Sequence, residues 1–289
     1  MDASRYPASR DELADWARRN TTTAGEARRR FAQYVVLVSI SSSAPIAAIA
    51  FKGGNALQFI HGNPRSTLDL DFTADAGFPD DPAEIKARLD ASLPFAERRH
   101  QVKARCQSIH RKPPGMDRTT PTYSIKVGYQ LSGDRYYQNF DERKMFSDVV
   151  EVEISLNDVV CETQPWQPEG SARELRACTL EDILAEKLRA MLQQIPRNRS
   201  RPQDVFDVAS MVRRYPSAID PGKVSAFLVR KAAARGITAS KAAFDGSVLA
   251  HAAIGYDAQI RPFTTQFIPL DEAWSEVLGF VSRLEIPDR

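Results

Sequence analysis

The sequence is short of the features that mark membrane, secreted and zinc-binding proteins. It has no run of about 18 apolar residues, and its first residues are polar and charged, so neither a membrane-spanning helix nor a secretory signal is predicted. Its three cysteines, Cys106, Cys161 and Cys178, show no CxxC or Cys–His spacing. A disulfide framework or a structural zinc site is therefore not expected, and we predict a soluble protein of the reducing cytoplasm.

Catalytic histidine patterns and a strong charge of one sign are also missing. The four histidines show no ligand or triad spacing, and no G-x-S-x-G motif occurs. With 39 Lys and Arg against 37 Asp and Glu, the formal net charge of +2 does not by itself indicate nucleic-acid binding. A chain of 289 residues suits one large domain or two ordinary ones.

What the sequence does contain is a glycine pair followed by a pair of acids. Gly53 and Gly54 follow a short apolar run and precede a helix-like segment, where a glycine turn presents backbone N–H groups to a phosphate. Asp69 and Asp71 then alternate with apolar residues, as on a strand with one buried face, so both carboxylates point to the same side. Paired carboxylates of this kind hold Mg²⁺ together with substrate phosphates.

Each half of this pattern has a simpler explanation when taken alone. A glycine pair is often only a turn, and two acids two residues apart are often a solvated strand end. The order strand, glycine pair, helix and acid-bearing strand is more specific, and it indicates nucleotidyl transfer.

This order resembles the polymerase-β-like nucleotidyltransferase superfamily. The closer forms, Lys-Gly-Gly-x-Ala-Leu from Lys52 to Leu57 and Arg-x-Thr-x-Asp-Leu-Asp-Phe from Arg65 to Phe72, are similar to the AbiEii/AbiGii-type nucleotidyltransferase toxins of bacterial toxin–antitoxin systems. The resemblance implies an α+β fold, with a mixed sheet domain followed by a helical domain. We expect residues 1–165 and 166–289 to form these two domains, with a loop over residues 162–173 between them.

A third carboxylate is expected on a neighbouring strand. Glu151 and Glu153 share one face of the predicted strand from Val149 to Leu156, and either acid suits a metal site. The superfamily carries its third acid on a strand of this order in the chain, and Glu153 matches that position better. The alternative is that both are an exposed polar face.

Lys187 and Asp204 are the candidates from the helical part. Lys187 lies inside the apolar stripe of a helix predicted from Thr179 to Ile195, so it either snorkels to water or meets a phosphate. The segment around it resembles the toxin family's lysine motif, in which the lysine contacts the nucleotide. Asp204 and Asp207 match the family's Arg-Asp-x-x-Asp pattern, although Gln203 replaces its arginine. Asp204 is taken as catalytic and Asp207 as mainly structural. The simpler alternative is that an acid in the first turn of a helix only interacts favourably with the helix dipole.

The resemblance also assigns roles to the residues that flank the acids. Lys52 and Arg65 are expected to bind the nucleotide with the two glycines and Lys187, although Arg65 could instead restrain the carboxylates by ion pairing. Thr67 matches a position that the antitoxin phosphorylates in some family members. It points the same way as the acids if the strand extends that far.

Runs of basic residues have two explanations. The run Arg28 to Arg30 is expected on the solvated face of a helix from about Gly25 to Val38. Three further clusters could contact RNA phosphates or simply be solvated: Arg98, Arg99, Lys103 and Arg105; Arg111, Lys112 and Arg118; and Arg197, Arg199 and Arg201. The third is favoured for RNA because it lies between Lys187 and Asp204 in the sequence.

The function expected from these residues is Mg²⁺-dependent transfer of a nucleoside monophosphate from a nucleoside triphosphate to an RNA acceptor. The family resemblance favours the tRNA 3′ end as acceptor and implies growth inhibition, pyrophosphate release and a cognate antitoxin. Two alternatives stay open. The enzyme could modify a small molecule such as an antibiotic, or a protein, and the fold could instead be an inactive nucleotide-binding relative.

Overall fold

The computed structural model describes residues 6–7, 9–42, 48–112, 121–171 and 173–289, and the chain divides into two units. The sheet unit comprises Met1–Phe59, Leu68–Asp158 and Gln164–Ala177. The helical unit comprises Ile60–Thr67, Val159–Thr163 and Cys178–Arg289. The predicted α+β architecture is confirmed. The expected domain boundary at residue 165 stays a prediction.

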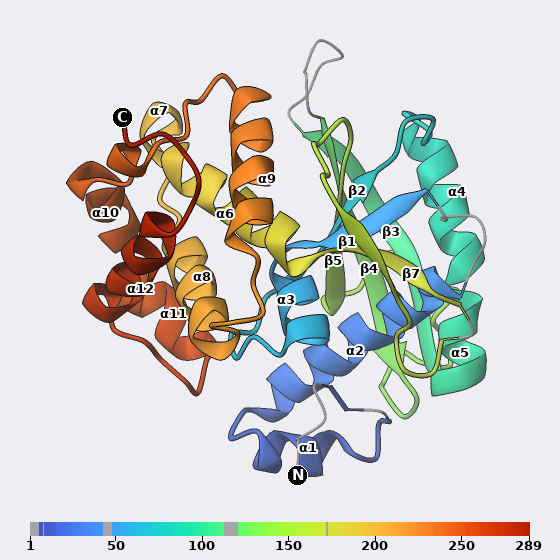
Figure 1. Cartoon of the computed structure of the whole chain (residues 1–289). Helices are drawn as coiled ribbons and strands as arrows, with labels where there is room; N and C mark the ends of the chain where they lie inside the picture. Colours follow the sequence, from blue (N-terminus) through green and yellow to red (C-terminus); the bar gives the residue numbers. More distant parts are fainter. Residues whose placement is uncertain (1–5, 8, 43–47, 113–120, 172) are drawn as a thin grey trace. The chain divides into compact units, whose positions relative to one another are not determined.

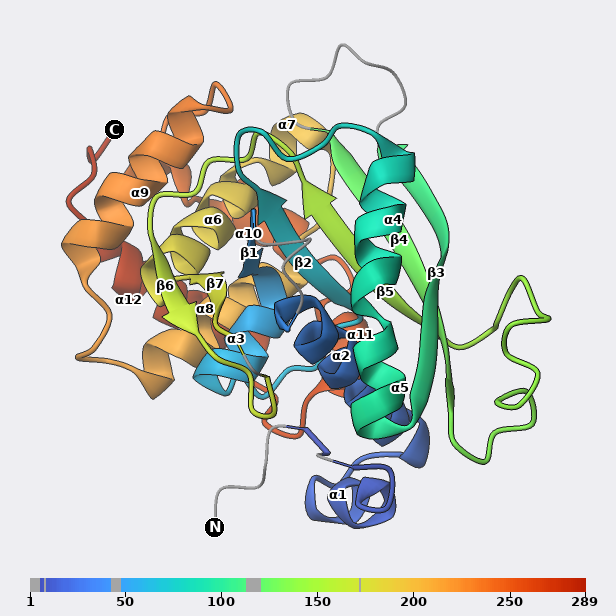
Figure 2. The same cartoon turned by 90° about the vertical axis from the view of Figure 1, so that its right-hand side faces the viewer.

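Among the described residues, seven strands form one mixed sheet in the order β3-β4-β5-β2-β1-β7-β6. Figure 1 labels the strands of this sheet other than β6, which is labelled in Figure 2. Their bounds are β1 Ile49–Lys52, β2 Asp69–Ala74, β3 Val102–Lys112, β4 Thr122–Leu131, β5 Val149–Ser155, β6 Thr163–Trp166 and β7 Leu175–Cys178. Strand β2 pairs antiparallel with β1 and parallel with β5, so the acid-bearing strand is central in the sheet.

The two central strands have one apolar and one polar face. In β2, Leu70 and Phe72 are fully buried. In β5, the exposed fractions of Val150, Val152 and Ile154 are 3% or less. The acids between them are half-buried on the opposite face. This alternation is the period of two that a strand imposes, and it puts the acids on one side of the sheet.

Five helices of the described sequence begin in the sheet unit: α1 (Leu13–Arg19), α2 (Ala24–Ser41), α3 (Gly53–His61), α4 (Pro82–Ser92) and α5 (Pro94–His100). Helices α2, α4 and α5 pack on β3, and Figure 2 shows α4 and α5 running along the strands on one face of the sheet. Helix α2 is capped by Thr23, whose side chain accepts a hydrogen bond from the Glu26 N–H.

The helical unit is built around α6 and α8. Helix α6 (Leu180–Leu192) packs on α8 (Pro202–Arg214) and on α9 (Pro221–Ala233), and α8 packs on α12 (Leu270–Ser282). The remaining elements are α7 (Gln194–Arg197), α10 (Gly246–Ala253), α11 (Tyr256–Ile260) and the short 3₁₀ helices η2 (Lys241–Ala243) and η3 (Arg261–Phe263). Thr179 caps α6 by accepting from the Asp182 N–H.

Two expectations about local structure were wrong. The segment expected as a loop over residues 162–173 contains strand β6, which pairs with β7 at the edge of the sheet. Its Trp166 stacks on the core ring of Phe51, with centroids 5.8 Å apart. Arg30, expected on a solvated helix face, is 1% exposed.

Arg118, in the second basic cluster, lies outside the described residues. In the described part of the chain, no helix is both long enough and apolar enough to cross a bilayer.

Candidate active site

The sheet unit brings four carboxylates together on the polar face of β2 and β5. Because the two strands are parallel and in register, Asp69 lies beside Glu151 and Asp71 lies beside Glu153. Each glutamate also has a lysine nearby: Lys126 is 3.7 Å from Glu151, and Lys112 is 3.8 Å from Glu153. The structure therefore places both predicted aspartates and both alternative third acids in one cluster. No group of three His, Cys, Asp or Glu side chains in the described residues is arranged as a complete metal site.

The protonation of Asp69 reflects this crowding. Burial, and then the negative charges of Asp71, Glu151 and Glu153, raise the pKa of Asp69 from 3.8 to about 7. Hydrogen bonding to Glu151 raises this pKa further, because it favours the protonated form of the Asp69 carboxyl. The donor set fits a hard divalent cation, because such an ion would take the place of that proton and neutralise the clustered charge.

The raised pKa makes the stability of the chelator-treated protein depend on pH. A carboxyl whose pKa is higher in the folded state stabilises the fold below its unfolded pKa, and this contribution is lost as pH rises through about 7. Between about pH 6 and pH 8, the unfolding free energy of wild type should fall by about 1 kcal/mol more than that of Asp69→Asn. Urea unfolding of both proteins in chelator measures this; parallel pH curves for the two would contradict it.

Gly53 allows the backbone to approach the acid pair. It has a left-handed φ of +73° at the start of α3, and a Cβ atom at this position would collide with the Asp71 carboxylate. Only glycine satisfies both conditions at low cost. The preceding Lys52 forms an ion pair with Asp158, with Nζ 2.5 Å from the carboxylate oxygen. The glycine turn and the acid pair, recognised in the sequence as separate motifs, are therefore in direct contact.

Gly53→Ala should lower the unfolding free energy by more than its backbone conformation explains. A non-glycine residue in the left-handed region costs about 1 kcal/mol, and displacing the Asp71 side chain adds to that cost. Gly236→Ala is the matched control, since Gly236 has a φ of +66° and no atom lies within 4 Å of the point that a Cβ would occupy. Urea unfolding of the two variants compares them, and equal losses would show that the contact with Asp71 is unimportant.

A buried polar network holds the beginning of β2. Arg30 donates to Asn55 Oδ1 at 2.6 Å, and Asn55 Nδ2 donates to the backbone carbonyl of Asp69 at 2.6 Å. Gln33 donates to the carbonyl of Leu68 at 2.7 Å. The Arg30 guanidinium also stacks on Phe59, 3.8 Å from the ring centroid. These contacts fix the backbone that presents the acids.

Sequence reasoning missed this network, although one signal was present. Arg30 precedes Tyr34 by four residues and Val38 by eight, so it falls within the apolar stripe of its helix. Asn55 directly follows the glycine pair, but nothing in the sequence showed that its partners are Arg30 and the Asp69 carbonyl.

The helical unit holds a second charged cluster, around Asp207. Lys187 Nζ lies 2.8 Å from Asp204 Oδ1 and 2.7 Å from Asp207 Oδ2. Arg65 donates to both oxygens of Asp207, from Nε at 2.8 Å and Nη2 at 2.7 Å, and Asn63 donates to it at 2.8 Å. All five side chains are buried. The predicted residues Lys187, Asp204 and Arg65 are thus in one network, centred on Asp207.

Electrostatics explain how this cluster stays charged in the interior. Burial alone would raise the pKa of Asp207, but the charges of Arg65 and Lys187 outweigh it and hold that pKa far below its usual value. Burial likewise lowers the pKa of Lys187, and the charges of Asp204 and Asp207 more than reverse the effect. Lys187 neither snorkels nor contacts solvent freely, and its charge is balanced by two carboxylates.

Thr67 lies in the helical unit, in the segment Ile60–Thr67. Strand β2 begins at Asp69, so the strand does not extend to Thr67, and its alternation does not fix the direction of the Thr67 side chain. Thr67 is partly buried.

Comparisons with known proteins point to the same chemistry as these residues. The family described as "Nucleotidyl transferase AbiEii toxin, Type IV TA system" matches residues 35–279. The structure of JHP933 from Helicobacter pylori is 17% identical, with a TM-score of 0.53 over 86% of this chain and 88% of that one. A second H. pylori structure, described as a candidate nucleotidyltransferase, is 17% identical, with a TM-score of 0.51 over 86% and 90% of the two chains. No curated protein matches the chain.

The two structures share the fold, and the family match covers most of the chain, including the glycine turn, the acid pair and the Lys187 and Asp204 helices. Membership implies a nucleoside triphosphate substrate and an antitoxin partner. The chain is therefore a nucleotidyltransferase, and it belongs to the AbiEii nucleotidyl transferase toxin family of type IV toxin–antitoxin systems.

Proposed function

We propose that this enzyme transfers a nucleoside monophosphate from a nucleoside triphosphate to an RNA acceptor, with Mg²⁺ as cofactor and the tRNA 3′ end as the favoured acceptor. The observation that carries the proposal is the pairing of Asp69 and Asp71 beside the Gly53 turn. Transfer would stop translation and inhibit growth, and the cognate antitoxin would control it. The enzyme would act in the cytoplasm, where both substrates occur.

Asp69 and Asp71 would hold the cation, with Glu153, beside Asp71, as the proposed third ligand and Glu151, beside Asp69, as the alternative. Mg²⁺ bound there would neutralise the triphosphate and lower the pKa of the attacking hydroxyl. The backbone N–H groups at Gly53 and Gly54 open helix α3 and suit a phosphate oxygen. In the reaction, the acceptor oxygen bonds to the α-phosphorus, the bond to the β-phosphate oxygen breaks, and pyrophosphate leaves with that electron pair. The hydroxyl proton passes to water.

The roles proposed for the charged side chains follow from their partners. Lys187 and Asp204 are proposed to act on the nucleotide together, and a phosphate could replace one carboxylate partner of Lys187. Lys52 could bind a phosphate in the same way by leaving Asp158. The contacts of Arg65 with Asp207 favour a positioning role over the nucleotide contact expected from the sequence.

Thr67 is proposed as the residue through which the antitoxin acts. A phosphate there would add about two negative charges. Such a charge would disfavour binding of a triphosphate. Intact-mass measurement of the toxin co-expressed with its antitoxin tests this, with Thr67→Val as the control. An unmodified mass for the neutralised wild type would exclude phosphorylation.

The proposed acceptor is tested by incubating the purified enzyme with Mg²⁺, each of the four α-labelled triphosphates, and total RNA or purified tRNA. Label in tRNA is expected with at least one nucleotide. Label found only in protein or in an added antibiotic would favour the alternative acceptors. Growth inhibition that is unchanged in Asp69→Asn, with no label anywhere, would favour an inactive binding relative.

A further inference from the structure

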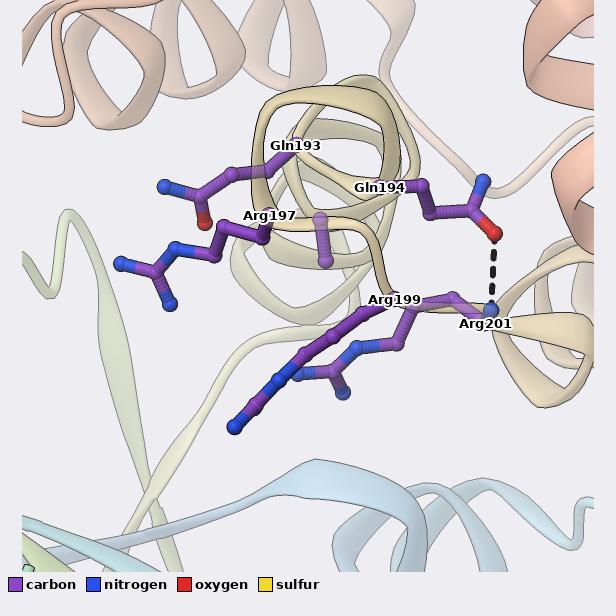
Figure 3. A pocket seen from close by; sticks show the side chains of 6 residues that line it. Gln193, Gln194, Arg197, Arg199 and Arg201 are labelled. Carbon is purple, nitrogen blue, oxygen red and sulfur yellow. Dashed lines mark hydrogen bonds between the residues drawn. The ribbon is translucent and has the colours of Figure 1, made fainter.

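Five arginines gather near the junction of α6, α7 and α8 in the helical unit. They are Arg189, Arg197, Arg199, Arg201 and Arg235, and we call them the arginine cluster. Three of them, Arg197, Arg199 and Arg201, line a surface pocket with Gln193 and Gln194. Figure 3 shows these three side chains extending to the same side of the loop that joins α7 to α8. They come from a stretch of five residues, so the loop conformation decides whether their charges converge.

The loop is held in the conformation that makes them converge. Asn198 ends α7 with a left-handed φ of 45°. Gln194 is 1% exposed, and its backbone and side-chain oxygens accept from the N–H groups of Arg199 and Arg201 at 3.0 and 2.7 Å. Ser200 donates to the carbonyl of Ile254 at 3.1 Å, which ties the loop to the end of α10. Because a buried glutamine accepts two hydrogen bonds from this loop, the loop conformation is fixed by the fold.

Within the cluster, Arg189 is paired with Glu186, whereas the arginines of the loop have little negative charge to balance them. Among the described residues, neither Arg197 nor Arg199 forms an ion pair, although both are exposed. Arg201 lies 3.9 Å from Asp204, whose other oxygen already binds Lys187. Burial, and then the charges of Arg235, Arg189, Arg199 and Arg201, lower the pKa of Arg197. By contrast, Arg213 on α8 is paired with both Glu272 and Glu276.

Crowded guanidinium groups with so few acidic partners are suited to an anion with several oxygens. Arginine binds phosphate through two parallel N–H donors, and phosphodiesters spaced along a strand would satisfy adjacent arginines together. We propose that Arg197, Arg199 and Arg201 bind backbone phosphates of the RNA acceptor, an inference that rests on the proposed transfer to RNA. The contact through Arg201 to Asp204 connects this surface to the Lys187 network within the same unit.

The test compares tRNA binding by wild type, Arg197→Glu/Arg199→Glu and Arg18→Glu/Arg19→Glu. The control pair has the same change in charge and also lies exposed at the end of a helix, α1. Fluorescence anisotropy with labelled tRNA, at several KCl concentrations and in the Asp69→Asn background, needs no catalysis. We expect the first pair to weaken binding about 30-fold in low salt and to reduce the salt slope by about 1.5, as for two lost phosphate contacts. The control should change affinity less than about threefold.

Other outcomes would overturn the proposal. Equal losses in the two variants would mean that only total charge matters, and unchanged tRNA affinity would exclude the contact. Loss of triphosphate affinity with tRNA affinity kept would assign the cluster to the nucleotide, and loss of antitoxin binding alone would assign it to an acidic protein surface. Arg197→Gln/Arg199→Gln, checked by thermal unfolding, provides a folded variant without added acids. If wild type binds no tRNA, the proposal that tRNA is the acceptor is wrong. If all variants modify tRNA equally, only the proposed role of the arginines is wrong.

Discussion

Asp69→Asn and Asp71→Asn should each reduce nucleotide transfer by about 1000-fold or more without unfolding the protein. Each change removes one negatively charged oxygen ligand from the site proposed for Mg²⁺ and keeps the side-chain shape. A 1000-fold loss corresponds to about 4 kcal/mol of transition-state stabilisation, a reasonable amount for a metal ligand in phosphoryl transfer. Initial rates of label transfer at saturating Mg²⁺, together with thermal unfolding, measure both parts of the prediction.

Asp75→Asn is the matched control for these variants. Asp75 directly follows β2 and is exposed, and its partner is Arg176 on β7 rather than the acid cluster. We expect transfer by this variant to stay within about threefold of wild type. If Asp69→Asn retains a tenth of the wild-type rate, the acid pair is not the catalytic centre.

Asp207→Ala should cost about 3 to 5 kcal/mol of unfolding free energy. The change leaves the guanidinium of Arg65 and the ammonium of Lys187 buried with one balancing carboxylate fewer, and an uncompensated buried charge is among the most destabilising single changes. Because the pKa of Asp207 is already held far below its usual value, its contribution is present above about pH 4 and is lost only in stronger acid.

Asp204→Ala is the informative comparison, since Lys187 keeps Asp207 as a partner in that variant. We expect it to cost about 1 to 2 kcal/mol in urea unfolding, clearly less than Asp207→Ala. If Asp204 acts in catalysis as proposed, transfer should fall strongly in a protein that stays folded. An Asp207→Ala protein within about 1 kcal/mol of wild type would contradict the account of the network.

The sheet unit shows what local patterns in a sequence can predict. The alternation around Asp69 and around Glu151 predicted two strands with an acidic face, and the structure has both in the expected orientation. What the alternation could not predict is the register of β2 and β5, in which Asp69 meets Glu151 and Asp71 meets Glu153. Register depends on the packing of the whole sheet, and no short motif contains it.

The helical unit shows a different limit. Lys187 was recognised as out of place in an apolar stripe, with either water or a phosphate as its expected partner. The structure supplies two aspartates instead, and one of them also binds Arg65, which lies 142 residues away in the sequence. Arg30 lies in a similar stripe and was assigned to solvent because it stands in a run of three arginines. In both cases the partners lie on a different helix, so the pattern reveals a buried charge but not the groups that surround it.

The position of the label tests most directly whether this chain transfers a nucleotidyl group. The purified enzyme is incubated with Mg²⁺, tRNA and the preferred triphosphate, labelled in one reaction at the α-phosphate and in another at the γ-phosphate. Label from the α-phosphate should enter tRNA, label from the γ-phosphate should appear in pyrophosphate, and both should disappear in Asp69→Asn. Label from the γ-phosphate in tRNA or protein would contradict the account, because it would mean that the enzyme transfers a terminal phosphate.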